Sequence, residues 1–497
     1  SIATNSGIRN KGKYAGLAER GTKNHQGLST GLDHLKDLGV THIHLLPFFD
    51  FVSVDEKKPE IPQYNWGYEP LNYNVPEGSY ASNGSDGVSR IRELKEMVMA
   101  FHSNGLNVVM DVVYNHTMLT EDSYFNQLVP GYYYRHTKDG KFSNATACGN
   151  ETASERPMMR KFMLESLLYW VKEYHIDGFR FDLMGVHDIE TMNLVARELR
   201  KIKPGILLYG EGWTAGESPF PEENRALKKF AYKLDDIAVF SDDMRDGMKG
   251  SVFLHGENGF VSGRVDRAES VRFGIVAGCR HPQVDYSKVN YSKEPYVRHP
   301  TGTITYADCH DNHVLWDKLT LSTPGYTDAD RREMYKLALG IVLTSQGIPF
   351  LHAGTEFLRT KKGNENSYNA GDSINAIDWE LKTKNSDVFA YCKELIRIRK
   401  SHPAFRMQRR EQVAAHIRFI EGLPAGMIGY TIDGSAVGDH WQKIRVYLNG
   451  VNISQSLSLD NQAWRSAIHN NKPGKDALMN TNLLVSPFTC TVLYQKK

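Results

Sequence analysis

Short apolar segments alternate with amphipathic helical patterns through the first 400 residues, and this alternation constrains the fold more than any other feature. The apolar segments begin near residues 41, 106, 178, 206, 238, 303 and 347. Helices are predicted at residues 28–38, 89–104, 154–174, 188–201, 328–344 and 386–400. Parallel strands separated by helices, in this number, predict an α/β fold of the (β/α)8 barrel type. Each strand ends in polar or ionisable residues, as at the active face of such a barrel.

The pattern changes after about residue 405. Four further apolar segments follow one another without intervening helices, at residues 414–420, 427–432, 443–448 and 488–494. They predict a small antiparallel β-sandwich. We therefore expect a catalytic barrel over residues 1–404, with an irregular excursion at 117–153, and a C-terminal β-sandwich domain over residues 405–497.

The predicted barrel is one strand short. In this fold every helix follows its own strand, yet residues 1–27 contain five glycines and no run of β-branched or aromatic residues. We predict loops and turns there. An open barrel exposes two strand edges, so we expect a segment upstream of this chain to supply the first strand. Residues 1–497 by themselves should then be poorly soluble or inactive.

Charge and cysteine content exclude several classes of protein. The formal net charge is +2 over 497 residues, which argues against nucleic acid or an anionic membrane as the main partner. No run of 18 apolar residues occurs. The five cysteines are too few and too scattered for a disulfide framework or a zinc site, so free thiols are expected.

The segment at residues 177–185 carries the most chemical information. It predicts a short strand with aromatic residues on one face and with Arg180 and Asp182 together on the other. A guanidinium beside a carboxylate keeps it ionised, as a nucleophile must be. A structural Arg–Asp pair explains this segment equally well.

Other ionisable residues follow the strands. They are the carboxylates Asp111, Asp182, Glu211 and Asp311, and the histidines His116 and His310. Two carboxylates in different surroundings are the minimum for glycoside hydrolysis. Glu211 has no cation adjacent in sequence, so a raised pKa and a general-acid role are predicted for it.

Three residues allow a functional and a structural reading. His42 and His44 share one face of a strand, so they are candidate metal ligands, although such pairs more often fill a barrel interior. Cys309 lies between Asp308 and His310. A reactive thiol is one reading, and a small packing residue is the more common one.

Four segments in order resemble the signature regions of the α-amylase superfamily of glycoside hydrolases: 111–116, 178–185, 210–213 and 306–312. The segment Tyr-Asn-Trp-Gly-Tyr-Glu-Pro at 64–70 is similar to the motif of the type I pullulanase family within that superfamily. Glu69 departs from this motif, because the family usually has Asp there.

The resemblance assigns roles to the candidate residues. It implies that Asp182 is the nucleophile, that Glu211 is the general acid/base, and that Asp311 stabilises the transition state. It also implies a set of substrate-binding residues: Arg180, which orients Asp182, and His116, His310, Tyr68, Trp66, Asp111, Trp213, Asp372 and Asn375. The carboxyl groups of Asp182 and Glu211 should lie about 5–5.5 Å apart, as retention of configuration requires.

The resemblance implies a retaining hydrolase for α-1,6-glucosidic branch linkages of pullulan, starch or glycogen. An isoamylase-type or glycogen-debranching hydrolase, or an inactive glucan-binding relative, is the alternative. The implied partner is an α-glucan, with no nucleic acid and no membrane, and a carbohydrate-binding module is expected upstream. No cofactor is required. Asn115 resembles a calcium ligand of α-amylases, so a structural calcium stays open, but no catalytic metal is expected.

Overall fold

The computed structural model describes residues 3–479 and 481–496, and the chain divides into two compact units. The first unit contains Ser1–Phe240 and Tyr368–Trp379, and the second contains Ser241–Ser367 and Glu380–Lys497. This division falls inside the predicted barrel region. The predicted domain boundary between residues 404 and 405 stays a prediction.

Five parallel strands form the main sheet of the described part of the first unit, in the order β8-β7-β6-β5-β2. They are β2 (His42–Leu45), β5 (Asn107–Val112), β6 (Gly178–Phe181), β7 (Leu207–Gly210) and β8 (Ala238–Phe240). All five occur where strands are predicted. Asp111 of β5 pairs with Arg180 of β6, and Arg180 pairs with Tyr209 of β7. This register brings the ends of three strands, and the ionisable residues after them, next to one another.

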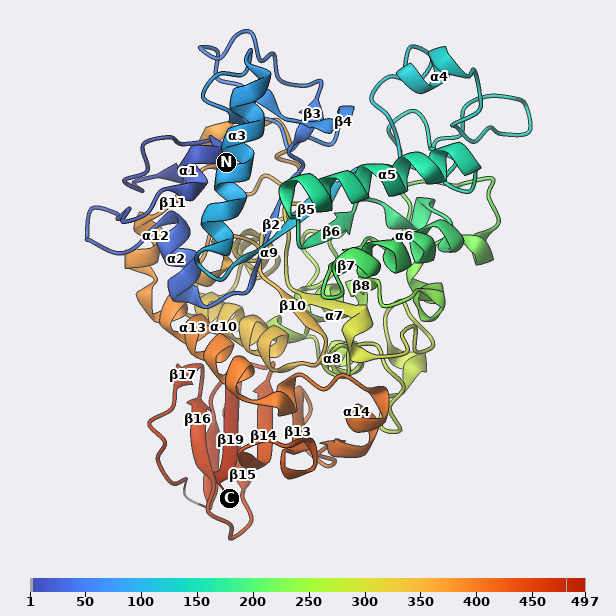
Figure 1. Cartoon of the computed structure of the whole chain (residues 1–497). Helices are drawn as coiled ribbons and strands as arrows, with labels where there is room; N and C mark the ends of the chain where they lie inside the picture. The colour runs from blue at the N-terminus through green and yellow to red at the C-terminus, as the bar shows by residue number, and fades with distance from the viewer. Residues whose placement is uncertain (1–2, 480, 497) are drawn as a thin grey trace. The chain divides into compact units, whose positions relative to one another are not determined.

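Four of the predicted helices occur in the first unit. They are α2 (Gly31–Leu38), α3 (Gly87–His102), α5 (Pro157–Tyr174) and α6 (Ile189–Ile202), each within a few residues of its predicted position. α3 contacts β5 and α5, and α5 contacts α6 (Figure 1). Asp86 caps α3 and Asp188 caps α6, because each carboxylate accepts backbone N–H groups of the first turn.

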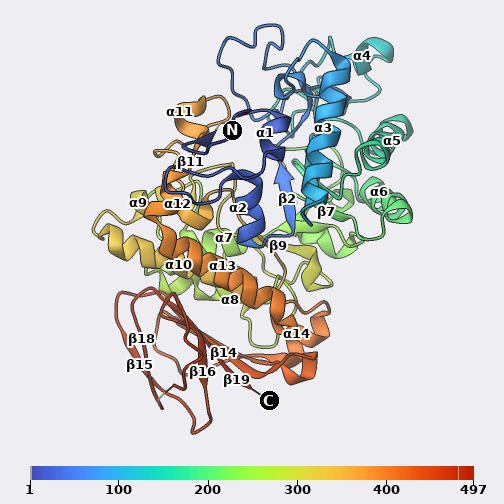
Figure 2. The ribbon, with the colours of Figure 1, turned by 60° about the vertical axis from the view of Figure 1, so that its left-hand side comes forward.

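The N-terminal region is more ordered than the sequence predicts. α1 (Tyr14–Ala18) packs beside α3 (Figure 2), and β1 (Ala3–Thr4) pairs with the distant β11 (Ile377–Asp378). The prediction of loops and turns throughout residues 1–27 is therefore wrong for these segments, while residues 1 and 2 lie outside the described residues. Strand β1 was missed because its partner lies more than 370 residues away.

The described part of the second unit contains the two remaining predicted parallel strands, β9 (Thr303–Tyr306) and β10 (Ile348–Phe350), which pair with each other. The predicted helices α10 (Asp328–Thr344) and α13 (Ser386–Ser401) pack together. The short helices that were not predicted include α7 (Asp242–Lys249), α8 (Ala268–Ile275) and α9 (Leu315–Ser322). Each has only eight residues, too few for a clear periodic pattern.

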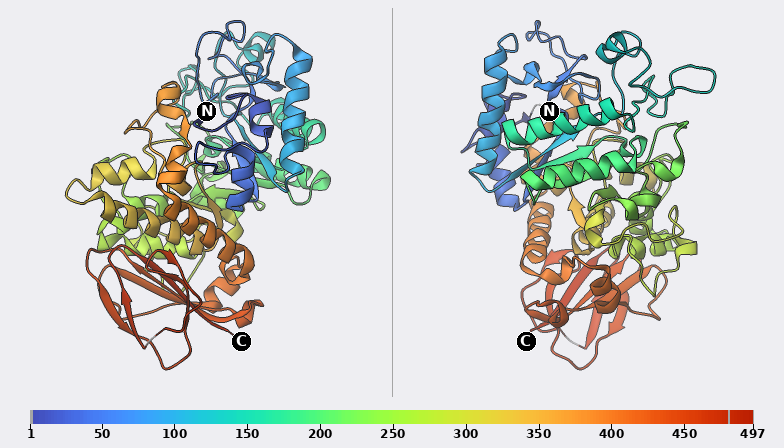
Figure 3. Two further views of the ribbon diagram at one scale, coloured as in Figure 1. Left: turned by 90° about the vertical axis from the view of Figure 1, so that its left-hand side faces the viewer. Right: turned by 45° about the vertical axis from the view of Figure 1, so that its right-hand side comes forward.

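The C-terminal part of the second unit is antiparallel β structure, drawn in red in Figure 3. A six-stranded sheet has the order β12-β13-β14-β19-β16-β17, and β15 pairs with β18 in a second sheet. The strands are β12 (Ile417–Phe419), β13 (Met427–Asp433), β14 (Trp441–Asn449), β15 (Gln455–Ser458), β16 (Arg465–His469), β17 (Lys472–Pro473), β18 (Asn482–Val485) and β19 (Cys490–Lys496). Met427, Tyr447 and Leu493 of the larger sheet share an apolar core with Leu483 and Val485 of the smaller one. Two sheets that face each other over one core form the predicted sandwich.

One predicted strand of this domain begins too early. Residues 414–416 belong to the helix α14 (Arg410–His416), and only Ile417–Phe419 are extended. The side chain of Gln412 accepts the backbone N–H of Arg409, which closes the first helical turn. A cap of this kind stabilises a helix that the apolar pattern by itself did not indicate.

All five cysteines are free, as predicted. Cys148 is exposed, Cys309 is half-buried, and Cys279, Cys392 and Cys490 are buried. Among the described residues, no helix combines the length and the apolar composition that crossing a membrane requires.

Candidate active site

Arg180 is the centre of a charged group at the ends of β5, β6 and β7. Its Nη1 atom lies 2.8 Å from Asp111 Oδ1 and 2.9 Å from Asp182 Oδ1, and its Nη2 atom lies 2.7 Å from Glu211 Oε1. The side chain is only 2% exposed. Burial alone would lower the pKa of Arg180, but the charges of Asp111 and Glu211 hold it well above its ordinary value. One permanent cation is thus shared by three carboxylates.

Glu211 differs from its predicted environment. The sequence shows no cation beside it, yet Arg180 contacts one carboxylate oxygen and the backbone N–H of Leu183 donates to the other at 2.9 Å. Both contacts stabilise a carboxylate and not a carboxylic acid. The expectation of a cation-free setting was wrong because β6 and β7 are adjacent in the sheet, although Arg180 and Glu211 are distant along the chain.

Asp111 is fully buried and is bound through both oxygens. Besides Arg180 on Oδ1, His44 Nε2 lies 3.0 Å and the Tyr68 hydroxyl 2.7 Å from Oδ2. The Tyr68 hydroxyl also lies 3.3 Å from Arg180 Nη1. Asp111 therefore fixes the positions of Arg180 and Tyr68.

Asn115 and His116 follow β5 and complete the surroundings of Asp182. Asn115 Nδ2 donates to Asp182 Oδ2 at 2.8 Å, and its Oδ1 lies 2.5 Å from His116 Nδ1. His116 Nε2 donates to the carbonyl of Tyr68 at 3.0 Å. Burial lowers the pKa of His116 to about 4, and the bond to Tyr68 opposes this only in part. Asn115 thus binds one carboxylate oxygen of Asp182, and Arg180 binds the other.

The backbone is strained directly after the candidate nucleophile. Leu183 has φ = 37°, in the left-handed region that residues with a side chain rarely adopt. Its N–H is the group that donates to Glu211. Gly185 follows, and a Cβ there would lie 2.5 Å from the carbonyl of Trp213. This sharp, crowded turn joins the residue after Asp182 to the segment after Glu211, and strain of this kind is concentrated at functional sites.

The aromatic residues of the 64–70 segment lie in two different environments. Tyr68 is half-buried, and its ring lies 5.6 Å from the Arg180 guanidinium carbon. Trp66 is 5% exposed and packs edge-on against Tyr68 and Tyr368, each at 6.4 Å between ring centroids. The backbone N–H of Trp66 also donates to the carbonyl of Tyr368. Trp66 thus pins this loop to the 368–379 segment, and its contact with substrate stays a prediction.

The remaining candidates of the first unit lie in two loops. Trp213 is half-buried in the segment after β7. Asp372 begins the short helix α11 (Asp372–Asn375) and is half-buried. Asn375 is buried, and its Nδ2 donates to the carbonyl of Gly371 at 3.2 Å. Glu69, the departure from the family motif, is half-buried, and burial raises its pKa.

His310 and Asp311 lie in the second unit, after β9. His310 Nε2 is 3.3 Å from Asp311 Oδ2, and the carboxylate of Asp311 remains 40% exposed. Lys361 donates to the carbonyl of His310 at 2.8 Å. Asn312, the next residue, has φ = 60°. Burial raises the pKa of Cys309 to about 12, which favours its packing role over reactivity.

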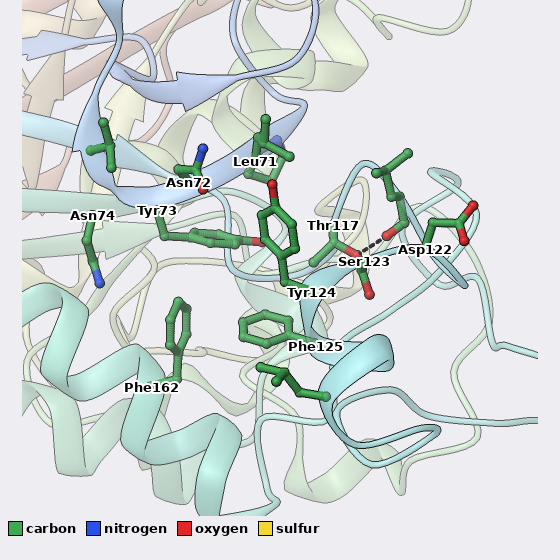
Figure 4. A pocket seen from close by; sticks show the side chains of 14 residues that line it. Leu71, Asn72, Tyr73, Asn74, Thr117, Asp122, Ser123, Tyr124, Phe125 and Phe162 are labelled. Atoms are coloured by element: carbon green, nitrogen blue, oxygen red, sulfur yellow. Dashed lines mark hydrogen bonds between the residues drawn. The ribbon is translucent and has the colours of Figure 1, made fainter. Parts of the chain in front are cut away.

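A cavity of about 270 Å³ lies away from the carboxylates in the first unit. Figure 4 shows Tyr73 of β4 (Pro70–Pro76), Phe125 of α4 (Tyr124–Leu128) and Phe162 of α5 around it. None of the predicted catalytic residues lines it. The hydroxyl of Tyr73, a residue that lines the cavity, donates to the carbonyl of His116 at 2.7 Å. The cavity wall therefore helps to position the backbone of His116.

Three groups of described residues have side chains close enough to share a metal ion: Asp50, Glu56 and Glu77; Cys309, His310 and Asp311; and His255, His313 and Glu365. Arg90 contacts Glu56 at 2.6 Å and Asp50 at 4.0 Å, so a side-chain cation already serves the first group. The second contains His310 and Asp311, two of the residues predicted to bind the sugar. Neither His42 nor His44 belongs to any of the three.

Comparison with known proteins identifies the family. Residues 13–142 match the α-amylase catalytic domain and residues 413–472 match the pullulanase all-β domain. The structure resembles the pullulanase of Paenibacillus barengoltzii in complex with maltohexaose and α-cyclodextrin, with a TM-score of 0.93 and 46% identity over 99% of this chain and 75% of that one. This chain belongs to the pullulanases of the α-amylase family.

Other pullulanases agree with this assignment. Type I pullulanase from Bacillus subtilis, solved with maltose, has a TM-score of 0.95 and 40% identity over 100% of this chain and 68% of that chain. In sequence, the Bacillus subtilis pullulanase is 43% identical over 94% of this chain, and pullulanase 1 of Arabidopsis thaliana 34% identical over 81%. The chain spans 62% and 53% of the lengths of these two proteins. The predicted fold class, a (β/α)8-type barrel with a C-terminal antiparallel β domain, is confirmed.

Sequence reasoning missed two residues of the site, His44 and the role of Asn115. His44 was considered only as a metal ligand or as filling of the barrel, and it contacts Asp111. Asn115 was considered only as a calcium ligand, and it contacts Asp182. The available signal was their position, because Asn115 lies just after β5, next to His116, and His44 lies near the end of the predicted strand β2.

Proposed function

We propose that this pullulanase-family chain is the catalytic part of a retaining hydrolase that cleaves α-1,6-glucosidic linkages of pullulan and branched α-glucans. The observation that carries the proposal is the single guanidinium of Arg180, which contacts the carboxylates of both Asp182 and Glu211. Two carboxyl groups held by one planar cation lie within a few Å of each other, as a double-displacement mechanism requires. Relatives of the chain are solved with maltose, maltotriose and maltohexaose, which supports an α-glucan as the substrate.

In this mechanism Asp182 attacks the anomeric carbon and forms a glycosyl-enzyme, while Glu211 protonates the departing oxygen. Glu211 then removes a proton from the water that releases the sugar. Because Arg180 and the Leu183 N–H stabilise the Glu211 carboxylate, Glu211 must take up a proton from solvent before it can protonate the departing oxygen. The carboxyl groups and water supply every step, so we propose that hydrolysis requires no metal.

The other residues position the reacting groups and the sugar. We propose that Asp111, which has no exposed surface, positions Arg180 and Tyr68 and does not touch the sugar. Tyr68 offers its half-buried ring as a platform, since aromatic faces pack on the flat C–H faces of sugars. Asp311 and His310 are proposed to bind hydroxyls of the glucose unit that is cleaved, as the exposure of the Asp311 carboxylate allows.

Expressed together with the upstream segment proposed below, the chain should release maltotriose from pullulan, and proton NMR of the first product should show retained configuration. Glu211→Gln and Asp182→Asn should abolish this release. Maltotriose with inverted configuration would exclude the double displacement but not the substrate. Cleavage of glycogen without cleavage of pullulan would favour the isoamylase-type alternative, for which we find no supporting observation.

We also propose that a further strand, supplied by a segment upstream of the chain, pairs with β2. Among the described residues β2 has β5 as its one partner, and all four of its residues are half-buried, whereas the four residues of β6 are buried. The sheet edge of a barrel strand is not normally open. The chain by itself should be poorly soluble or inactive. A chain of residues 1–497 that is monomeric, stable and fully active would contradict this proposal and leave the hydrolase assignment intact.

A further inference from the structure

Three side chains of the second unit gather around one point outside the site described above. They are His255 in the loop after α7, His313 just before α9, and Glu365 in the loop after β10. His255 Nε2 lies 2.5 Å and His313 Nδ1 lies 4.0 Å from the same oxygen, Oε2 of Glu365. The two imidazole rings meet edge to face with centroids 4.6 Å apart. The three donor atoms all lie within 4.8 Å of one another.

The hydrogen bonding of His313 shows which ring nitrogen carries the proton and which one is the acceptor near Glu365. His313 Nε2 lies 3.1 Å from the carbonyl of Gly363. A carbonyl only accepts, so Nε2 carries the proton, and in the neutral ring Nδ1 is unprotonated. Nδ1 and the Glu365 carboxylate therefore face each other as two acceptors, an arrangement that a cation between them completes.

The carbonyl of Gly363 is also the kind of hydrogen-bond partner that a metal-bound histidine usually has. A histidine ligand almost always donates its other ring N–H to a carbonyl or carboxylate, which fixes the tautomer and the ring orientation. A simple ion pair between His255 and Glu365 accounts for those two residues. It does not account for the buried His313, whose unprotonated nitrogen faces the same carboxylate.

Two adjacent residues of α9 hold the loops that carry the other two side chains. The Asp317 carboxylate accepts the backbone N–H of Lys361 at 2.8 Å and of Gly363 at 3.0 Å, two positions before Glu365. Lys318 Nζ donates to the carbonyls of Ser251, Leu254 and His255, at 2.9, 2.7 and 3.0 Å respectively. Both Asp317 and Lys318 are buried. The loops are thus fixed by the helix that begins just after His313, which preorganises the group.

We propose that His255, His313 and Glu365 form a binding site for a divalent transition-metal ion of the zinc type. Two imidazole nitrogens and one carboxylate oxygen are a typical zinc ligand set, with water in the fourth position. Calcium and magnesium prefer oxygen ligands throughout. Tetrahedral zinc places its ligand atoms about 3–3.5 Å apart, which follows from metal–ligand distances near 2.1 Å. To reach this spacing, the distance from Glu365 Oε2 to His255 Nε2 must lengthen from 2.5 Å, and its distance to His313 Nδ1 must shorten from 4.0 Å. The His255 and Glu365 side chains are exposed, so both can move.

The inference is independent of the proposed hydrolysis, because none of the three residues takes part in it. Zinc at this position would tie the loops at 251–255 and 360–365 to the start of α9. Since His313 lies two residues after Asp311, the metal would also fix the segment that carries this carboxylate. The site is therefore assigned a structural role.

Zinc binding to the metal-stripped chain, measured by titration calorimetry, tests the proposal. We expect one zinc ion per chain, and Co²⁺ in its place should give the visible absorption bands of a tetrahedral site. His255→Ala and Glu365→Gln should each weaken zinc binding more than 100-fold, because removal of a ligand costs more than removal of an outer partner. His440→Ala, an exposed histidine of the same unit outside the group, is the matched control and should bind zinc normally.

Thermal unfolding provides a second measurement. At a free zinc concentration 100-fold above the dissociation constant, zinc should lower the unfolding equilibrium constant about 100-fold in the wild-type chain and in His440→Ala only. Equal zinc binding in all four proteins, or none in a folded wild-type chain, would overturn the proposal. His313→Ala is less informative, because loss of a buried side chain alters folding by itself.

Discussion

Two buried charges, one in each unit, are bound in different ways. Arg180 in the first unit donates to side chains, those of Tyr68, Asp111 and Asp182, and forms an ion pair with Glu211. Lys318 in the second unit donates to three backbone carbonyls.

The charge of a carboxylate can change in a reaction, whereas a backbone carbonyl carries no charge that a reaction changes. From this difference we expect Arg180 to serve the proposed chemistry and Lys318 to serve the position of its loops. Substitutions in the two groups should therefore change different measured quantities.

The largest effect is expected for Asp182→Asn. Loss of the attacking carboxylate should lower kcat on pullulan by about 10⁴-fold or more, by analogy with other hydrolytic nucleophiles. The amide has the same shape, so circular dichroism and the unfolding midpoint should stay close to those of the wild type. Activity within tenfold of the wild type would mean that Asp182 is a structural partner of Arg180 and would remove the basis of the comparison.

Arg180→Lys should have the next largest effect. An ammonium group cannot contact Asp182 and Glu211 through two fixed nitrogens as the planar guanidinium does. We expect kcat/KM to fall by about 10²–10³-fold, comparable to the loss of one preorganised donor to a transition state. Steady-state kinetics on pullulan measures this. If Arg180→Lys lowered the unfolding free energy strongly and left kcat/KM nearly unchanged, the role of Arg180 would be structural.

The buried, uncharged side chain of His187 should contribute to the pH dependence of the unfolding free energy. His187 is fully buried in the first unit, and burial and the nearby Arg135 lower its pKa to about 3. Within the described residues neither ring nitrogen has a hydrogen-bond partner. Its folded pKa lies below its unfolded value near 6.5, so the stabilisation is complete above pH 6.5. It is lost as the pH falls from 6.5 towards 3, because the unfolded state binds the proton first.

The expected loss from His187 is about 4 kcal/mol over this pH range. Urea unfolding at a series of pH values measures the dependence. In His187→Leu the unfolding free energy should fall less steeply below pH 6.5 than in the wild type. An unchanged slope would assign the acid sensitivity to other groups.

Lys318→Met should affect stability and not chemistry. The methionine fills the space but leaves three carbonyls without their donor, and we expect the unfolding free energy to fall by about 2 kcal/mol. Denaturant unfolding measures the change, while kcat should stay within a few-fold of the wild-type value. A kcat loss as large as that of Arg180→Lys would show that the two groups of charges are not distinct.

The smallest effect is expected for Tyr68→Phe. The ring remains, but the hydroxyl bond to Asp111 is lost, which should cost about 1 kcal/mol and lower kcat/KM by roughly tenfold or less. Tyr68→Ala also removes the ring and should weaken substrate binding and turnover together. Equal effects of the two substitutions would mean that the hydroxyl, and not the ring, carries the contribution of Tyr68.

The sequence by itself determined the strands, most of the long helices and the positions of the candidate carboxylates. Apolar periodicity is local, so β5, β6, β7, β9 and β10 occur where the sequence predicts them. The signature segments lie at their ends and indicated the family.

Only the tertiary structure decided which charges meet. Arg180 reaches Glu211 because β6 and β7 are neighbours, and His44 reaches Asp111 because β2 and β5 are. His255, His313 and Glu365 lie more than 50 residues apart along the chain, and no local pattern links them. Contacts between neighbouring strands and between loops depend on how distant segments pack. A local apolar pattern carries no information on that packing.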